Sequence, residues 1–156
     1  MVLKIEDFVY NLQDAMKADF SSFIDAVNTE RGDTMLSHFA DESYFIQTLD
    51  ERVANYDQFV IIQAGNPTMN GTERSTSLVT YPISVYMSFD AGTTDTGGKK
   101  LYRYLDALVR FMLDKFWEVS LKPFKILNLD QMALIDIDKS KRVVATGITL
   151  EVSFGL

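Results

Sequence analysis

The fold is decided by residues 75–89, which read STSLVTYPISVYMSF. Apolar side chains alternate there with small or polar ones, and a period of two predicts a long, half-buried β-strand. The face expected to meet the core carries Val79, Tyr81, Ile83, Val85, Met87 and Phe89. Because Pro82 has no N–H to donate to a ladder, we expect the strand to lie at an edge there or to carry a bulge.

The segment before this strand predicts another strand and a turn. Phe59-Val60-Ile61-Ile62 is a continuous apolar run rich in β-branched residues, which is typical of a strand buried on both faces. It ends at Gly65-Asn66-Pro67, and Met69-Asn70-Gly71-Thr72 follows with residues that tolerate positive φ. Residues 33–55 stay ambiguous: 43–49 fit a short strand and 51–54 fit a helical turn.

Two amphipathic helices are predicted. From Ile5 to Val27 apolar residues recur at spacings of three and four, and the pattern stops near Gly32, so one long helix or two short ones fit. A second helix is expected from about Lys100 to Val119, where Pro123 blocks continuation. Its apolar stripe consists of Leu101, Leu105, Leu108, Met112 and Phe116, widened by Tyr104, Val109 and Leu113.

The last third predicts a hairpin. Residues 124–129 and 133–138 resemble strands, residues 139–141 form a polar turn, and residues 144–154 alternate cleanly. We expect the last strand to pair inside the sheet. Together these elements predict a single α+β domain over residues 1–156, in the order α-β-β-α-β-β. Its mostly antiparallel sheet of four to six strands packs against two main helices on one face.

Composition narrows the function. The 156 residues include no cysteine, which excludes disulfides, thiolate metal sites and cysteine nucleophiles. No apolar run reaches the roughly 18 residues of a membrane span, so a cytoplasmic protein is expected. The net charge is −7, which disfavours nucleic-acid binding through counterion release. Residues 1–78 hold 5 basic and 13 acidic residues, a balance of −8, whereas residues 79–156 hold 10 and 9, a balance of +1. This asymmetry fits either simple solubility or an acidic face that meets a more basic face on another copy.

No pattern predicts catalysis. Residues 92–100 resemble a phosphate-binding loop, but Gly98 is inserted before the lysines and Lys100 replaces the hydroxyl residue, so a polar loop with a glycine-rich helix entry is preferred. Asp136 and Asp138 with Asp130 fit a solvated hairpin face better than a cation site. His38 has no nucleophile motif near it and is expected at the surface. We therefore expect no catalytic, cofactor-binding or metal-binding residues, and no enzyme. Trp117 fits an interface anchor about as well as a position in the core or at its rim.

The layout resembles the tail-terminator, or tail-completion, proteins of long-tailed bacteriophages. The similar features are the opening amphipathic helix, the strand Val79 to Met87, the helix Leu101 to Trp117 after a polar loop, and the closing strand Val143 to Val152. The resemblance implies a structural protein that forms a hexameric ring on the tail tube. The ring ends tube polymerisation and joins the tail to the head.

The resemblance also implies partners and places. They are further copies of the chain, the tail tube protein and a head-completion or neck protein, with no cofactor and no membrane. Genomic DNA passes through the lumen unbound, and the protein is in the host cytoplasm during assembly and then at the head–tail junction of the virion. The candidate interface residues are Asn66, Asn70, Glu73, Arg74, Asp90, Thr94, Asp95, Lys99 and Lys100. Another neck or head-completion connector subunit, or a small-ligand-binding α+β domain, remains the alternative.

Overall fold

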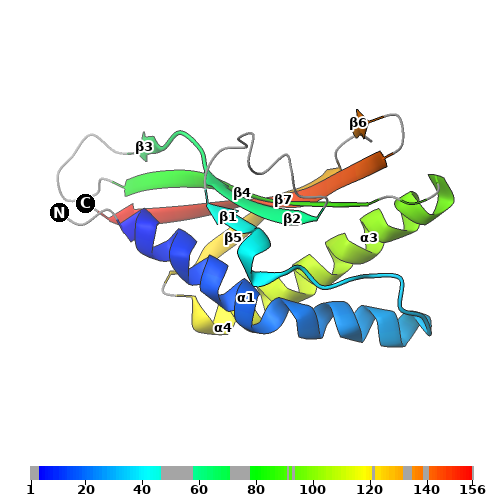
Figure 1. The fold of residues 1–156 in the computed structure, drawn as a ribbon. Helices are drawn as coiled ribbons and strands as arrows, with labels where there is room; N and C mark the ends of the chain where they lie inside the picture. Colours follow the sequence, from blue (N-terminus) through cyan, green and yellow to red (C-terminus); the bar gives the residue numbers. More distant parts are fainter. Residues whose placement is uncertain are drawn as a thin grey trace.

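A computed structural model describes residues 4–46, 58–70, 78–90, 92, 94–120, 122–131, 135–138 and 141–155, and the structural statements below concern those residues. They form two layers, with a twisted sheet lying over a pair of long helices (Figure 1). The predicted α+β class, with a mostly antiparallel sheet and helices on one face, is confirmed.

Five strands form the path of the sheet in the order β1-β2-β4-β7-β5. They are β1 (Tyr44–Ile46), β2 (Phe59–Ala64), β4 (Leu78–Asp90), β7 (Lys141–Gly155) and β5 (Phe124–Gln131). Two short strands extend it: β3 (Thr68–Asn70) pairs with β4, and β6 (Ile135–Asp138) pairs with β7. Every pairing is antiparallel except that of β1 with β2.

Strand β4 lies between β2 and β7, so it is not an edge strand as a whole. At Pro82, however, the ladder on the β2 side is interrupted. The β2 ladder ends where Ala64 faces Ile83, and the β3 ladder begins where Thr68 faces Thr80. The Pro82 carbonyl accepts a hydrogen bond from Gly65 N–H at 2.7 Å, which points the ring nitrogen to the same side. The missing donor therefore faces the break between two ladders and disrupts neither.

The closing strand β7 pairs inside the sheet as predicted, with β4 on one side and β5 and β6 on the other. Strands β5 and β6 do not pair with each other; they lie end to end along β7. A bulge between Ile126 and Asn128 leaves Leu127 as the extra residue on β5. The turn at residues 139 and 140 lies outside the described residues.

The first helix is a single helix, α1 (Lys4–Arg31). Gly32 follows it in the left-handed conformation, at φ 69°, and caps its C-terminus. The second helix has three parts: α3 (Thr94–Arg110), the π-helical segment η2 (Phe111–Phe116) and α4 (Trp117–Val119). The predicted end at Val119 is correct, but the predicted start is wrong. Residues 94–98 form the first turn of α3 because glycine lowers helix propensity without preventing helix formation when the surrounding chain is helical.

The π-helical turn also explains why one predicted core residue is wrong. Leu113 is 53% exposed, whereas Phe111, which interrupts the predicted stripe, is fully buried. In a π-helix residues five apart share a face, and the rings of Phe111 and Phe116 lie 6.2 Å apart in a stacked arrangement. The wider turn brings both phenylalanines into the core and rotates Leu113 outward.

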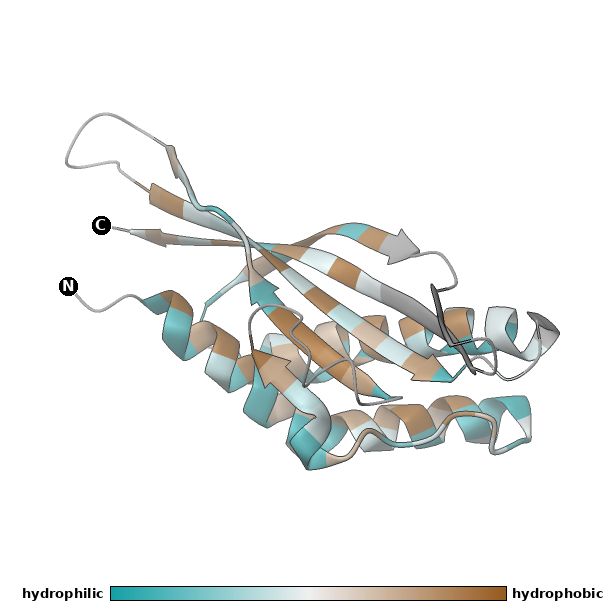
Figure 2. Cartoon of the chain, turned by 45° about the horizontal axis from the view of Figure 1, so that its top comes forward, coloured by the Kyte–Doolittle hydropathy of each residue, from teal (hydrophilic) through white to brown (hydrophobic). Residues whose placement is uncertain are grey.

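One main core fills the space between the helices and the sheet, where the apolar faces of both layers meet (Figure 2). It contains Phe8, Phe20 and Phe111, all at most 1% exposed, and most of the predicted inner faces of β4 and β7. Val79 of the predicted β4 face is outside this core, and the side chain of Val144 lies outside the described residues. Phe59 and Ile61 form a second small cluster with Phe45, so β2 is buried on both faces as predicted. Burial of these large aromatic side chains supplies most of the stabilisation of the fold.

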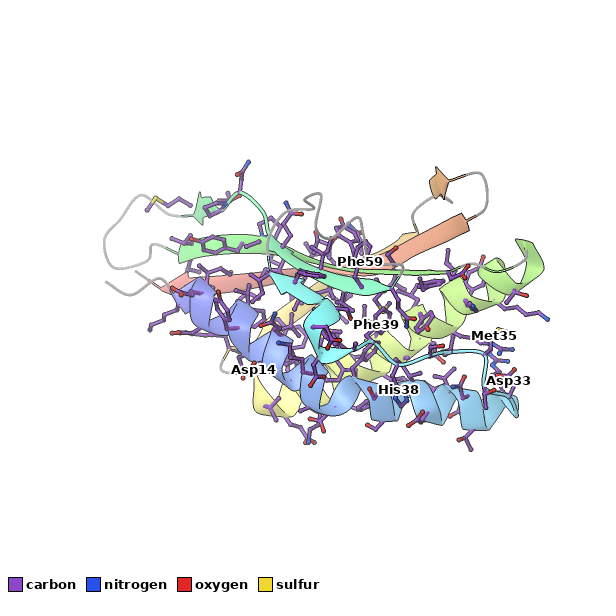
Figure 3. The ribbon with its side chains drawn as sticks, viewed as in Figure 1. Asp14, Asp33, Met35, His38, Phe39 and Phe59 are labelled. Carbon is purple, nitrogen blue, oxygen red and sulfur yellow. The ribbon has the colours of Figure 1, made fainter. Side chains whose placement is uncertain are left out.

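Residues 33–40 run back along α1 from its end to the 3-10 turn η1 (Asp41–Ser43) and β1 (Figure 3). The buried Asn28 amide holds this segment: its Nδ2 donates to the Leu36 carbonyl at 2.9 Å, and its Oδ1 accepts from Leu36 N–H at 3.0 Å. The Tyr104 hydroxyl of α3 both donates to and accepts from the backbone of Ser37, each at 2.9 Å. The segment therefore ties α1 to α3.

Candidate assembly surfaces

The predicted interface residues lie at two opposite ends of the molecule. Asn66 is exposed beside β3, and the backbone of Asn70 ends that strand; Glu73 and Arg74 lie outside the described residues. Asp90 and Lys99 are exposed at the other end, where β4 stops and α3 begins (Figure 1). Along β4 the backbone of Asn70, opposite Leu78, lies about 40 Å from Asp90, and Asn66, which follows Gly65 beside Pro82, lies roughly 27 Å from it. The structure therefore joins the predicted residues into two sites and not one.

At the β3 end the backbone packs tightly and apolar side chains face solvent. A Cβ on Gly65 would lie 2.9 Å from the Pro82 ring, so only glycine fits between the two ladders. Met69 on β3 is 64% exposed, and Leu78 at the start of β4 is 44% exposed. These two residues sit on adjacent register positions of the β3–β4 pair and therefore on opposite faces of it.

At the α3 end, hydrogen bonds to Asp90 hold the connection between β4 and α3. The Asp90 carboxylate accepts from Gly92 N–H at 2.9 Å, and the Lys100 ammonium donates to the Asp90 carbonyl at 2.9 Å. Since α3 begins at Thr94, Lys99 and Lys100 lie in its second turn and not at its start. The glycines of residues 97 and 98 therefore lie inside the first turns of the helix and not in the loop before it. The helix contains Thr94 and Asp95, whose side chains lie outside the described residues.

The sequence analysis missed a third surface, along the β5 edge of the sheet. Three of the nine large exposed apolar residues of the described chain lie on β5 or pack against it: Leu127 and Leu129 on the strand, and Trp117, which contacts Phe124. An edge strand exposes unpaired backbone groups, and exposed leucines on it favour pairing with another chain. The available signal was the adjacent pair Ile126-Leu127, which breaks the alternation of the strand.

A groove of about 450 Å³ lies at the start of β5. It is lined by Trp117, Lys122, Pro123, Phe124, Lys125, Glu151 and Ser153. The Trp117 indole is 54% exposed and packs edge-on against Phe124 with ring centroids 5.2 Å apart. The exposed indole rules out a core position for Trp117, and the interface interpretation stays a prediction. We call Trp117, Lys122, Lys125, Leu127 and Leu129 the β5 surface.

The opposite edge of the sheet carries acidic groups. Gln13 on α1 donates to the Tyr44 carbonyl at 3.0 Å, which places one face of α1 beside β1. Tyr10 and Asp14 flank Gln13 on that face and are exposed. The exposed Asp41 and Glu42 of η1 immediately precede β1. We call Tyr10, Asp14, Asp41 and Glu42 the α1 surface.

Two ion pairs away from these surfaces link the helices. Arg110 holds Glu30 in a bidentate pair at 2.7 and 2.9 Å, and this hydrogen bonding lowers the pKa of Glu30. Arg103 donates to Asp33 at 2.7 Å and, with the backbone N–H of Met35, lowers the pKa of that carboxyl. These two arginines join α3 to the end of α1.

The residues considered for chemistry take structural positions. His38 is exposed as predicted, and its Nε2 lies 2.6 Å from Asp25 on α1. Asp136 and Asp138 lie on the backbone of β6, opposite Arg142 and Lys141, but their side chains fall outside the described residues. In the described part of the chain no three His, Cys, Asp or Glu side chains gather as metal ligands.

Within the described ranges no helix is long and apolar enough to cross a membrane. Compared with protein-family models and with curated proteins, the sequence matches none.

Proposed function

We propose that this protein is a structural subunit of a long-tailed bacteriophage that forms a ring on the tail tube, ends tube polymerisation and joins the tail to the head. The observation that carries the proposal is the β5 surface, where apolar side chains, an exposed tryptophan and an open strand edge occur together. Such a surface favours a protein partner over a small substrate.

The geometry of the subunit suits a position between the tail tube and the neck protein. Strand β3 and the start of α3 lie at opposite ends of β4, whereas the two edges of the sheet, β1 and β5, are separated across the strands. In a ring the edges contact neighbouring copies, and the resemblance to tail terminators implies six of them. One end then meets the tube and the other meets the neck protein. The layout of helix, long strand, helix and closing strand that resembles tail terminators is retained in the fold.

The charge of the chain suits the passage of DNA. With a net charge of −7, a ring of these subunits offers its lumen few cations for phosphate groups to bind. DNA is therefore expected to slide through without specific contacts. The protein has no catalytic role in this proposal, and it acts first in the host cytoplasm and then at the head–tail junction.

Electron microscopy of the purified protein, with light scattering for mass, tests the proposal. The expected result is a ring with a central hole, six subunits in mass, which stops growth when added to polymerising tail tubes. Rings of twelve that bind a portal would instead identify a neck connector. A protein that stays monomeric both alone and on tubes, and leaves tube length unchanged, would contradict the proposed function.

A further inference from the structure

The two edges of the sheet are chemically different and complementary. The β5 surface offers an exposed indole, two leucines and the cations Lys122 and Lys125, with Glu151 facing Lys125 across the β5–β7 ladder. The α1 surface offers the Tyr10 ring and three carboxylates, from Asp14, Asp41 and Glu42. From this complementarity we infer that the β5 surface of one copy docks on the α1 surface of the next copy; this rests on the proposed ring.

The placement of the two surfaces decides the kind of contact. Four strand-to-strand steps separate β1 from β5, which is roughly 19 Å at the usual strand spacing. One copy cannot satisfy both surfaces itself, and two copies related by a two-fold axis would oppose like charges. A head-to-tail contact pairs unlike surfaces at every junction and leaves one of each free at the ends. It gives a ring where the rotation between copies closes, as the proposed function requires, and an open filament otherwise.

Two side chains of the β5 surface, Trp117 and Lys122, are positioned by contacts within the subunit. Trp117 is fixed by its edge-on contact with Phe124, and the Lys122 ammonium lies 5.8 Å from the centre of the Phe154 ring. Fixed side chains lose less conformational entropy on binding than mobile ones. The bulge at Leu127 places an additional apolar side chain on the edge, beyond the lysines.

Charge reversal tests the inference. The double variant Lys122→Glu, Lys125→Glu is expected to raise the concentration needed for ring formation roughly 100-fold, because like charges then face each other. Adding Asp41→Lys and Glu42→Lys to the same chain is expected to restore rings. The control variant Lys4→Glu, Arg31→Glu makes the same change in net charge at exposed positions of α1 outside the α1 surface. Circular dichroism confirms that each variant is folded.

Mixing the variants distinguishes the geometry. Lys122→Glu, Lys125→Glu has an intact α1 surface, and Asp41→Lys, Glu42→Lys has an intact β5 surface. Neither variant alone is expected to form rings, whereas a mixture is expected to form rings in which the two variants alternate, since unlike charges then face each other at every junction. A two-fold contact through β5 alone would give homodimers of the second variant and overturn the inference.

Disulfide cross-linking gives a second measurement, helped by the absence of native cysteine. A chain with both Glu42→Cys and Lys125→Cys is expected to form a ladder of covalent oligomers that ends at the ring size, while each single variant forms none. Rings that survive charge reversal and give no ladder overturn this contact but leave the ring function standing. A wild-type chain that forms no ring, alone or on tubes, contradicts the proposed function itself.

Discussion

Two polar side chains, Asn28 and Tyr104, fix the segment of residues 33–40 by hydrogen bonds to its backbone. Asn28 satisfies both backbone groups of the buried Leu36, and Tyr104 does the same for Ser37. Sequence reasoning assigned Asn28 no role and placed Tyr104 in an apolar stripe, because a hydrogen bond between residues 8 or 67 positions apart leaves no periodic pattern. Among the described residues no buried side-chain nitrogen or oxygen lacks a partner.

Asn28→Ala is expected to lower the free energy of unfolding by about 2 to 3 kcal/mol, because it leaves the Leu36 N–H and carbonyl buried without partners. Urea denaturation measures the change. Asn11→Ala is the matched control: Asn11 makes one exposed hydrogen bond, to the Val119 carbonyl, and its loss should cost less than about 1 kcal/mol. Equal losses in the two variants would contradict the role given to Asn28.

The stability of the protein is expected to fall between pH 10 and pH 12. Burial raises the pKa of Tyr104 to about 12, although hydrogen bonds with Ser37 and Gln58 oppose the shift, and burial also raises the pKa of Tyr44. An unfolded tyrosine releases its proton near pH 10, so above that pH the unfolded state binds fewer protons and is favoured. Urea denaturation at stepped pH measures the loss, which Tyr104→Phe should reduce. Stability that is constant to pH 12 would contradict it.

Two elements, the β4–β7 pair and the second helix, determine the shape of the subunit. The thirteen paired positions of β4 and β7 form the axis of the sheet. Their alternation was predictable, because one face of each strand is buried and the other is not. The pairing partners were not predictable from the sequence, since pairing of β5 and β6 with each other or with β7 would differ little in local free energy.

Gly147→Ala is expected to lower the free energy of unfolding by about 2 kcal/mol or more, because the new Cβ would lie 2.0 Å from the Val85 carbonyl oxygen. The two central strands would have to separate. Gly155→Ala, on the same strand, meets no atom within 4 Å and is expected to change stability by less than about 0.5 kcal/mol. Thermal unfolding of both variants measures the difference; a Gly147→Ala protein as stable as wild type would contradict the close strand contact.

Gly98→Ala is expected to stabilise the protein by about 0.5 to 1 kcal/mol. Residue 98 lies inside α3, where a Cβ meets nothing within 4 Å and alanine loses less backbone entropy than glycine. Denaturant unfolding measures the gain. Gly92→Ala serves as the opposite control, because Gly92 has φ 65° and alanine is strained there. Destabilisation by Gly98→Ala would restore the loop interpretation of residues 94–98.

On the scale of the whole molecule, the ends and the edges have separate tasks in the proposed ring. Contacts with the tube belong to an end, and contacts between copies belong to the edges. In that arrangement the two kinds of contact use different residues, so a change at one end is expected to leave the contacts between copies intact.

Lys99→Glu with Lys100→Glu is expected to leave ring formation unchanged while reducing the ability of the ring to stop tube growth. The two lysines lie at the α3 end, away from both edges, and reversal of their charge alters only that end. Tube lengths in electron micrographs, with ring mass by light scattering, measure the two effects. Normal tube capping by this variant would remove the α3 end from the tube contact, and loss of rings would contradict the separation of tasks.

The sequence by itself determined the α+β class, the two amphipathic helices and the inner faces of β4 and β7, because burial of one face imposes a period that adjacent residues reveal. Tertiary structure alone decided the π-helical turn that exposes Leu113, the end-to-end placement of β5 and β6, and the exposure of the β5 surface. These features depend on contacts between residues far apart in the chain. Local periodicity records which side chains are apolar, but not which neighbour covers them.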